Sequence, residues 1–209
     1  VLAGLVRAGR LPAMRLYIDS PMAQAATRIT LQHEGLLDEE TRDLIAWQRA
    51  HPKLLDIHFV ADYQESMALA EVRGGAVILS ASGMCEAGRV KYHLANNLPR
   101  PECTVLITGF QAAGTLGRRL VDGARNVRIF GQPVPVRASI VTTGGLSAHA
   151  DQAALLGWLR GFRRPPGQTF VVHGEPEAAG ALATALRRDF GWPGVEVPAY
   201  GSEWRLSGL

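Results

Sequence analysis

Short apolar runs alternate with helix-length segments along the first half of the chain. Runs such as 76–80 and 104–108 are apolar almost throughout and are bounded by turn residues, which is typical of strands buried on both faces. The segments between them carry helix start signals, such as Pro21 after Asp19 and Ser20. This alternation predicts an α/β fold with a mostly parallel, doubly wound sheet. The predicted strands are 15–18, 57–60, 76–80 and 104–108, and the predicted helices are 22–32, 38–50, 63–72, 85–96 and a segment ending near residue 121.

The pattern changes near Gly123, where alternation of apolar and polar residues replaces the continuous runs. Residues 126–130 and 133–140 alternate in this way on either side of a Gly-Gln pair, which predicts an antiparallel hairpin. We therefore place a domain junction here and divide the chain into residues 1–124 and 125–209. Beyond the hairpin we predict strands at 140–143, 169–172, 195–197 and 203–206, and helices at 151–162 and 176–190.

The composition is ordinary for a globular protein, with 47% hydrophobic and 20% charged residues in a chain of 209. A net charge of +3 is compatible with a polyanionic partner, although an arginine-rich surface explains it equally well. Cys85 and Cys103 form no CxxC pair, which favours a reducing compartment, and we expect a cytoplasmic protein. No apolar run reaches the roughly 18 residues of a membrane-spanning helix, so no membrane partner is expected. The opening Val1–Val6 has the pattern of a helix interior, and we expect the chain to be part of a longer protein.

Two histidines mark the most informative chemistry, because each begins a loop after a predicted strand of one βαβ-like unit spanning 140–172. In open α/β sheets, reactive groups collect at the carboxyl ends of strands, so both imidazoles can face one cleft. His149 could donate a proton to a leaving oxygen or stabilise an oxyanion, or it could hydrogen-bond within its own loop. His173 could ligate a metal, or it could be a half-buried structural residue. For each histidine taken singly, the structural alternative is favoured.

A second candidate site is the loop Ser82-Gly83-Met84, which follows the predicted strand 76–80. Free backbone N–H groups and a helix N-terminus at this position would suit a phosphate. Arg89 and Lys91 could assist in holding the anion. An ordinary turn between a strand and a helix has the same composition, so the signal is weak.

The glycine-rich segment 109–117 could also cradle an anion, but it contains neither a Walker pattern nor GxGxxG. A flexible connection between two domains is the favoured interpretation of this segment. Asp19 is interpreted as a helix cap, and His93 as a structural residue.

Six motifs occur in order along nearly the whole chain, and together they resemble the β-CASP group of metallo-β-lactamase-fold nucleases. That group includes bacterial and archaeal RNA-processing enzymes and the 3′-end endonuclease of the eukaryotic cleavage and polyadenylation machinery. The resemblance implies that residues 1–124 are most of the β-CASP cap, and that residues 125–209 are the C-terminal part of a metallo-β-lactamase αββα fold with its RNA-specificity segment. The motifs are 17–23 (YIDSPMA), 80–84 (SASGM) with 88–89 (GR), 109–111 (GFQ) with 114–117 (GTLG), 134–138 (VPVRA), 146–151 (LSAHAD) and 172–175 (VHGE).

The resemblance implies a two-metal, usually zinc, phosphodiester hydrolase that acts on RNA, in which a metal-bound water or hydroxide attacks phosphorus. By match to the motifs, His173 is a ligand to one metal. His149 contacts the scissile phosphate and assists the leaving group. The loop residues Ser82, Gly83 and Met84 lie against the RNA backbone. The order of the motifs thus favours the catalytic interpretation of both histidines over the structural one.

The sequence departs from the family at the metal site, because the family's H-x-H-x-D-H motif has no counterpart in it. One imidazole cannot hold a catalytic zinc, which needs about three protein ligands, so we expect this chain alone to be inactive. The alternatives are a non-catalytic RNA-binding or scaffold member, a DNA-directed nuclease, and a different hydrolase on the same scaffold. Single-stranded RNA is the expected partner, and unpaired sheet edges would favour a homodimer.

Overall fold

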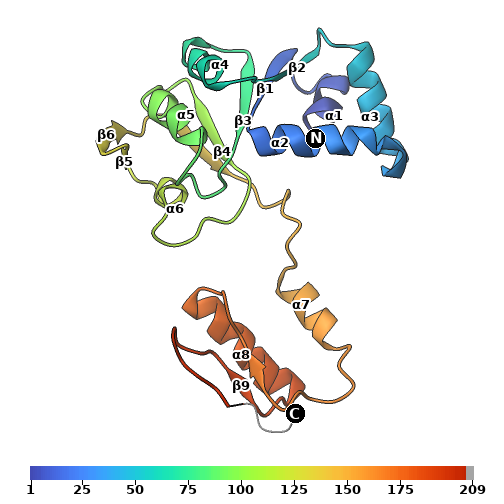
Figure 1. The fold of residues 1–209 in the computed structure, drawn as a ribbon, viewed down its shortest axis with the longest axis vertical. Helices are drawn as coiled ribbons and strands as arrows, with labels where there is room; N and C mark the ends of the chain where they lie inside the picture. The colour runs from blue at the N-terminus through green and yellow to red at the C-terminus, as the bar shows by residue number, and fades with distance from the viewer. Residues whose placement is uncertain (206–209) are drawn as a thin grey trace. The chain divides into compact units, whose positions relative to one another are not determined.

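Three parallel strands form a sheet in the order β2-β1-β3, with β1 (Met14–Asp19), β2 (Leu55–Phe59) and β3 (Ala76–Ser80). The computed structural model describes residues 1–205 (Figure 1). β1 is the central strand, and Asp19, its last residue, is in register with Ser80 of β3. The last four residues of β1 are buried, as expected for a strand with neighbours on both edges.

Side-chain caps define the starts of the helices that connect these strands. The Ser20 hydroxyl accepts from the Ala23 N–H (3.3 Å), and the Asp38 carboxylate accepts from the Thr41 N–H (2.8 Å). Ser20, and not Asp19, is therefore the cap of the first connecting helix. The helices before β7 are α1 (Leu2–Arg7), α2 (Pro21–Gln32), α3 (Glu39–Ala50), α4 (Tyr63–Ala68), α5 (Val90–Asn97) and α6 (Leu116–Val121), with 3₁₀ turns η1 (Glu34–Leu36) and η2 (Leu69–Glu71).

Helix α5 begins later than the sequence pattern predicts. The expected start is Cys85 or Glu86, whereas the first helical residue is Val90. Cys85 (φ 61°) and Gly88 (φ 76°) both adopt the left-handed conformation, which a right-handed helix cannot contain. The loop after β3 therefore extends over residues 81–89, and we call it the 81–89 loop.

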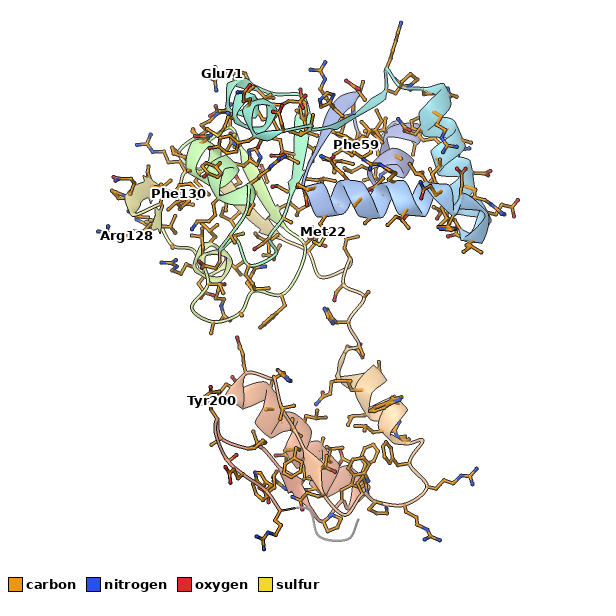
Figure 2. The ribbon with its side chains drawn as sticks, in the orientation of Figure 1. Met22, Phe59, Glu71, Arg128, Phe130 and Tyr200 are labelled. Atoms are coloured by element: carbon orange, nitrogen blue, oxygen red, sulfur yellow. The ribbon has the colours of Figure 1, made fainter. Side chains whose placement is uncertain are left out.

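A second parallel pair, β4 (Thr104–Ile107) with β7 (Ser139–Thr142), and an antiparallel hairpin, β5 (Asn126–Ile129) with β6 (Gln132–Pro135), complete this part of the chain. The predicted hairpin is thus confirmed. Its apolar side chains join α5 and α6 in one core, and Figure 2 shows Arg128 and Phe130 at the hairpin. The buried members of this core include Leu94, Leu98, Leu116, Leu120, Val127, Ile129 and Val134.

The remaining elements are α7 (Gln152–Leu159), β8 (Thr169–Phe170), α8 (Pro176–Phe190) and β9 (Val195–Glu196). β8 pairs in parallel with β9, whereas β7 pairs with β4. The predicted βαβ-like unit is therefore wrong, because its two strands belong to different sheets. Of the predicted strand 203–206, residues 203–205 are not in a strand and Leu206 lies outside the described residues. The core of this part contains Val171, Ala179, Ala183, Leu186, Trp192 and Val195.

The chain divides into two compact units, residues 1–146 and the residues from Ser147 onward, which we call unit 1 and unit 2. The junction that we predict between residues 124 and 125 is a boundary between family domains, not between compact units. It stays a prediction. The mixed α/β fold with mainly parallel strands is confirmed. Within residues 1–205, no helix combines the length and the apolar character needed to cross a bilayer.

Candidate functional site

The 81–89 loop in unit 1 offers backbone donors to a ligand. Within residues 1–205, no hydrogen bond uses the N–H groups of the consecutive residues Ser82, Gly83 and Met84. Gly83 is exposed, and its two neighbours are half-buried. Successive N–H groups without protein acceptors form the kind of site that binds an anion such as phosphate. The structure thus keeps these three residues together as a candidate anion-binding loop.

The segment 109–117 holds this loop from one side. The buried Gln111 side chain donates through Nε2 to the Gly83 carbonyl (2.8 Å), and the Gly117 N–H donates to the Met84 carbonyl (3.2 Å). The Glu86 carboxylate accepts from the Leu116 N–H. The glycine-rich segment is therefore bonded to the 81–89 loop, which differs from the flexible connection that its composition suggests.

Two glycines allow these close approaches. A Cβ on Gly88 would lie 2.9 Å from the Ala81 carbonyl oxygen, and Gly88 has a φ of 76°. A Cβ on Gly117 would lie 1.6 Å from Oε1 of Gln111. At Gly88 the near atom belongs to the backbone, so a side chain there would displace the loop, whereas at Gly117 a side chain would require the end of the Gln111 side chain to move.

A buried polar cluster lies at the base of the loop, and we call it the Asp19 cluster. Oδ2 of Asp19 accepts from the Ser66 hydroxyl (2.6 Å) and lies 2.6 Å from Nε2 of His93. Oδ1 accepts from Nη1 of Arg89 (2.6 Å). The Asp19 carboxylate is fully buried. The sequence interpretation of Asp19 as a helix cap is therefore wrong, and the available signal was the spacing of four between Arg89 and His93, which places two polar side chains on one helical face.

The electrostatics of the Asp19 cluster keep its carboxylate ionised. Burial by itself raises the pKa of the Asp19 carboxyl. The hydrogen bonds from Ser66, Arg89 and His93 outweigh that effect and hold the pKa below its usual value. Ser66 and His93 both bond to the same oxygen of Asp19, so the serine hydroxyl is not directed at the imidazole. The cluster therefore lacks the nucleophile–base contact of a hydrolytic triad.

The cations that the sequence places near the loop are engaged elsewhere. Arg89 is paired with Asp19, and Nζ of Lys91 lies 5.1 Å from the centroid of the Phe130 ring. Tyr92 also packs on Phe130, with ring centroids 4.6 Å apart. Anion binding at the 81–89 loop would therefore depend on backbone groups.

His149 lies in unit 2, in the exposed segment before α7. Its N–H donates to the Ser147 hydroxyl (3.2 Å), and Asp151 caps α7 by accepting from the Ala154 N–H (2.8 Å). Within residues 1–205, the imidazole ring has no hydrogen-bond or ion-pair partner. The local structure thus fixes the backbone and leaves the ring available.

His173 is also exposed in unit 2, between β8 and α8. It has a φ of 66°, the left-handed conformation that is uncommon for a residue with a Cβ. The next residue, Gly174, allows a close approach, since a Cβ there would lie 3.3 Å from that of Ala179. Strained backbone of this kind concentrates at functional sites. Among the described residues, its ring has no side-chain partner.

The described residues do not contain a complete metal site. Within residues 1–205, no group of three or more His, Cys, Asp or Glu side chains could hold a metal ion. A zinc ion needs about three protein ligands, so His173 would need partners from outside this set. The roles of His149, His173 and the loop residues 82–84 stay predictions.

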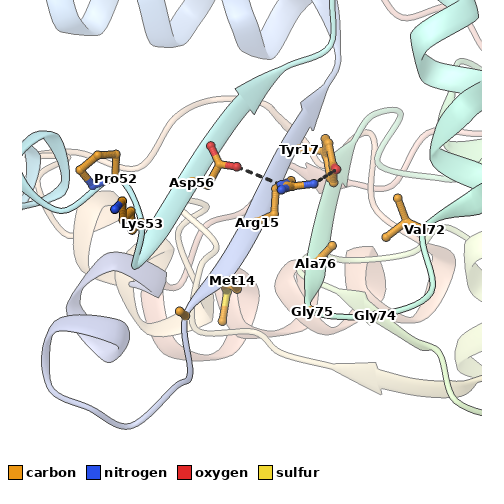
Figure 3. Close-up of a pocket in the computed structure, with 11 residues that line it drawn as sticks. Met14, Arg15, Tyr17, Pro52, Lys53, Asp56, Val72, Gly74, Gly75 and Ala76 are labelled. Atoms are coloured by element: carbon orange, nitrogen blue, oxygen red, sulfur yellow. Dashed lines mark hydrogen bonds and ion pairs between the residues drawn. The ribbon is translucent and has the colours of Figure 1, made fainter.

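A cavity of about 750 Å³ lies at the amino ends of β1, β2 and β3 (Figure 3). Arg15 crosses it, donating to Asp56 (2.9 Å) and to the Tyr17 hydroxyl (3.1 Å). This end is opposite to the 81–89 loop, and ligands of parallel sheets bind at carboxyl ends. A smaller cavity of about 370 Å³ lies at the carboxyl ends of β4 and β7, beside Gln111 and Thr143. The cavity at the amino ends is therefore not the candidate site.

Comparison with known proteins matches two parts of the chain to family domains. Residues 1–120 match the family described as Beta-Casp domain, and residues 133–197 match the Zn-dependent metallo-hydrolase RNA specificity domain. Ribonuclease TTHA0252 of Thermus thermophilus is 35% identical over 177 residues, which cover 85% of this chain and 40% of the relative. Transcription termination factor FttA of Pyrococcus abyssi is 30% identical over 197 residues, which cover 91% of this chain and 30% of that protein.

An RNase J-like protein of Methanocaldococcus jannaschii is 26% identical over 200 residues, covering 96% of this chain and 44% of the relative. The chain thus spans less than half the length of each of these curated relatives. The first family match covers more than half of the 209 residues. The arrangement of parallel strands, the anchored 81–89 loop and the two family matches lead to one conclusion: this chain belongs to the β-CASP family of metallo-β-lactamase-fold proteins.

Proposed function

We propose that this chain is part of a metal-dependent phosphodiester hydrolase that acts on RNA. The observation that carries the proposal is the 81–89 loop, in which three consecutive N–H groups have no acceptor within residues 1–205 while the surrounding backbone is held by hydrogen bonds. The match of residues 133–197 to an RNA specificity domain supports RNA as the ligand. The name ribonuclease of a relative supports hydrolysis as the reaction.

Three parts of the chain carry the proposed chemistry. The N–H groups of residues 82–84 hold a phosphate of the RNA backbone. His149 contacts the scissile phosphate and can protonate the leaving oxygen. His173 offers its imidazole to one ion of a two-zinc site, whose other ligands come from outside this chain. The zinc site supplies the activation of water, and the exposed rings of both histidines are free to take these roles.

We extend the proposal to the partner and the compartment. Single-stranded RNA suits a loop that binds through backbone donors, because such contacts need no duplex geometry. Cys85 and Cys103 are both free thiols, which supports the cytoplasm. A homodimer could form along the free edges of the β2-β1-β3 sheet, since β2 and β3 have unpaired outer edges within the described residues.

A second candidate function is RNA binding without cleavage. Several relatives carry the name transcription termination factor, which describes no cleavage. In that case the 81–89 loop would bind RNA in the same way, and His149 and His173 would not take part in hydrolysis. The two candidates differ in whether the natural full-length protein cleaves RNA.

The test is cleavage of a labelled single-stranded RNA, with zinc or manganese added. The 209-residue chain is compared with the natural full-length protein. We expect cleavage by the full-length protein and none by the shorter chain. Binding without cleavage by the full-length protein would favour the second candidate. Cleavage by the shorter chain would contradict the proposal that most metal ligands lie outside it.

A further inference from the structure

Both ends of the 81–89 loop are attached to one residue. At the start, the Ser80 hydroxyl donates to the backbone carbonyl of Asp19 (3.0 Å). At the other end, Arg89 donates to the Asp19 carboxylate (2.6 Å). The residues between Ser80 and Arg89 are the ones that carry the free N–H groups. Asp19 therefore joins the two ends of the loop that the proposed function places against RNA.

Because the Asp19 cluster is buried, the hydrogen bonds that attach the loop to Asp19 must keep good geometry. The Asp19 side chain is 0% exposed, that of His93 10% and that of Arg89 20%. A buried carboxylate is tolerated only when its donors keep good geometry, because an unpaired buried charge is strongly unfavourable. The donors come from different elements: Ser66 lies in α4, Arg89 immediately before α5, and His93 within α5. The cluster therefore links α4 and the start of α5 to the end of β1.

The residues on either side of Arg89 contact the start of the loop directly. The Val90 N–H donates to the Ala81 carbonyl (3.4 Å), and Gly88 packs against the same carbonyl at a distance that excludes a Cβ. The Cys85 N–H donates to the Ser82 carbonyl and turns the loop (3.1 Å). A shift of Arg89 away from Asp19 would therefore displace the backbone that carries the candidate phosphate donors.

We propose that Asp19 is a positioning residue for RNA binding, which clasps the two ends of the 81–89 loop and preorganises its N–H groups for phosphate. This inference rests on the proposed function. Preorganised donors bind an anion more tightly because no ordering of the loop is required on binding. Asp19 itself does not touch RNA, since it is fully buried.

The test compares RNA binding by the natural full-length protein and its variants, measured by fluorescence anisotropy of a labelled oligouridylate in EDTA, which prevents cleavage. Asp19→Asn keeps the size of the side chain and removes its charge. The matched control is Asp56→Asn, which breaks the Arg15 ion pair of the same sheet at its opposite, exposed end. We expect Kd to rise about tenfold for Asp19→Asn, because the loop must then be ordered when RNA binds, and not to change for the control.

A purely structural role of Asp19 gives a different result. It would lower the fraction of binding-competent molecules, measured by stoichiometric titration, and leave Kd of the remaining molecules unchanged, which would overturn the proposal. Ser66→Ala serves where Asp19→Asn does not fold, because it removes one neutral donor from the same oxygen. Hydrogen exchange adds a readout that is independent of RNA. We expect faster exchange at Cys85 and Val90 in the variant and unchanged exchange in the β5–β6 hairpin.

Gly83→Asp separates this proposal from the proposed function. A Cβ at Gly83 meets nothing within 4 Å, so the variant should fold, and its charge should repel phosphate. If Gly83→Asp weakens RNA binding and Asp19→Asn does not, RNA binding by the loop stands and the positioning role is wrong. If the wild-type protein does not bind RNA, both the proposed function and the positioning role are wrong.

Discussion

The 81–89 loop and the two histidine segments are candidate parts of one reaction, yet their local structures are opposite. The loop lies over a fully buried carboxylate and is bonded to the segment 109–117 and to Ser80. The segments around His149 and His173 are exposed, and within residues 1–205 neither ring has a partner. One region is held in place by this chain, and the other has its functional groups free.

The difference follows from the kind of group that each region offers. Backbone N–H groups recognise an anion only when the loop that carries them has a defined shape, so the chain must supply the support. A histidine side chain is oriented by its ligand and by second-shell partners once a site is complete. Within residues 1–205, the two rings of unit 2 have no such partner. Variants in the two regions should therefore affect different properties.

The largest effect should come from His149→Ala in the natural full-length protein. Loss of a proton donor to the leaving oxygen lowers the rate by about a hundredfold or more. The free energy of unfolding should not change, because the ring is exposed and without a partner among the described residues. Single-turnover cleavage and urea unfolding measure the two quantities. The exposed His33 provides the control, as His33→Ala should leave both unchanged. A loss of stability in His149→Ala would show that the His149 ring contributes to the fold, which would contradict the contrast between the two regions.

Asp19→Asn should have the opposite profile, with a large effect on stability. Breaking a buried ion pair leaves Arg89 without its partner, and we expect the free energy of unfolding of unit 1 to fall by about 3 kcal/mol. Asp56→Asn breaks an exposed pair and should have a much smaller effect. Urea unfolding followed by a probe in unit 1 checks both variants. Equal effects of the two substitutions would show that the Asp19 cluster does not stabilise unit 1.

Gly88→Ala tests the packing of the 81–89 loop. The added Cβ lies 2.9 Å from the Ala81 carbonyl oxygen, and φ is 76°, so clash and backbone strain combine. We expect a loss of about 2 kcal/mol in the free energy of unfolding. Gly75 has a similar φ of 65° and open space around a Cβ. Gly75→Ala should therefore lower the free energy of unfolding by about 1 kcal/mol, because only backbone strain contributes. The two unfolding midpoints in urea should differ in this order, and the reverse order would exclude the close approach at Gly88.

His173→Gly should stabilise unit 2 while removing a candidate metal ligand. Glycine adopts a φ of 66° without steric cost, so we expect a gain of up to about 1 kcal/mol. Phe130 also has a positive φ, of 52°, but its ring packs on Tyr92. Phe130→Gly should therefore not stabilise the protein. Thermal unfolding measures the change, and zinc content of the full-length protein measures the role in metal binding. Unchanged zinc content would remove His173 from the proposed site.

The pH dependence of stability should show the smallest effect. The pKa of Asp19 is lower in the folded chain than its ordinary value of about 3.9, so its contribution to stability is complete above that value. It is lost as the pH falls through the lowered folded pKa, because the unfolded chain then binds the proton first. Urea midpoints between neutral pH and about pH 3 should therefore fall less for Asp19→Asn than for the wild type. An identical pH dependence would mean that Asp19 is not ionised in the folded protein.

Local features of the fold were predictable because they depend on near neighbours in the sequence. The Ser20 and Asp38 caps, the hairpin and the β3 strand follow from residue types at fixed offsets. The sequence pattern predicts too early a start for α5, because no pattern reveals that Cys85 adopts a left-handed conformation. The candidate site residues came from motif order, and their roles stay predictions.

The sequence by itself determined the α/β class and the family and supplied the candidate site residues, because periodicity, turn chemistry and motif order are local properties of the chain. The tertiary structure decided which groups meet. Asp19 bonds to Ser66 and to His93, which are 47 and 74 positions away in the sequence. In the same way, β7 pairs with β4, which is distant in the sequence, and not with β8, the next strand along the chain. Contacts at such separations depend on how elements pack in three dimensions, and the hydrophobic pattern of each element does not record its partner.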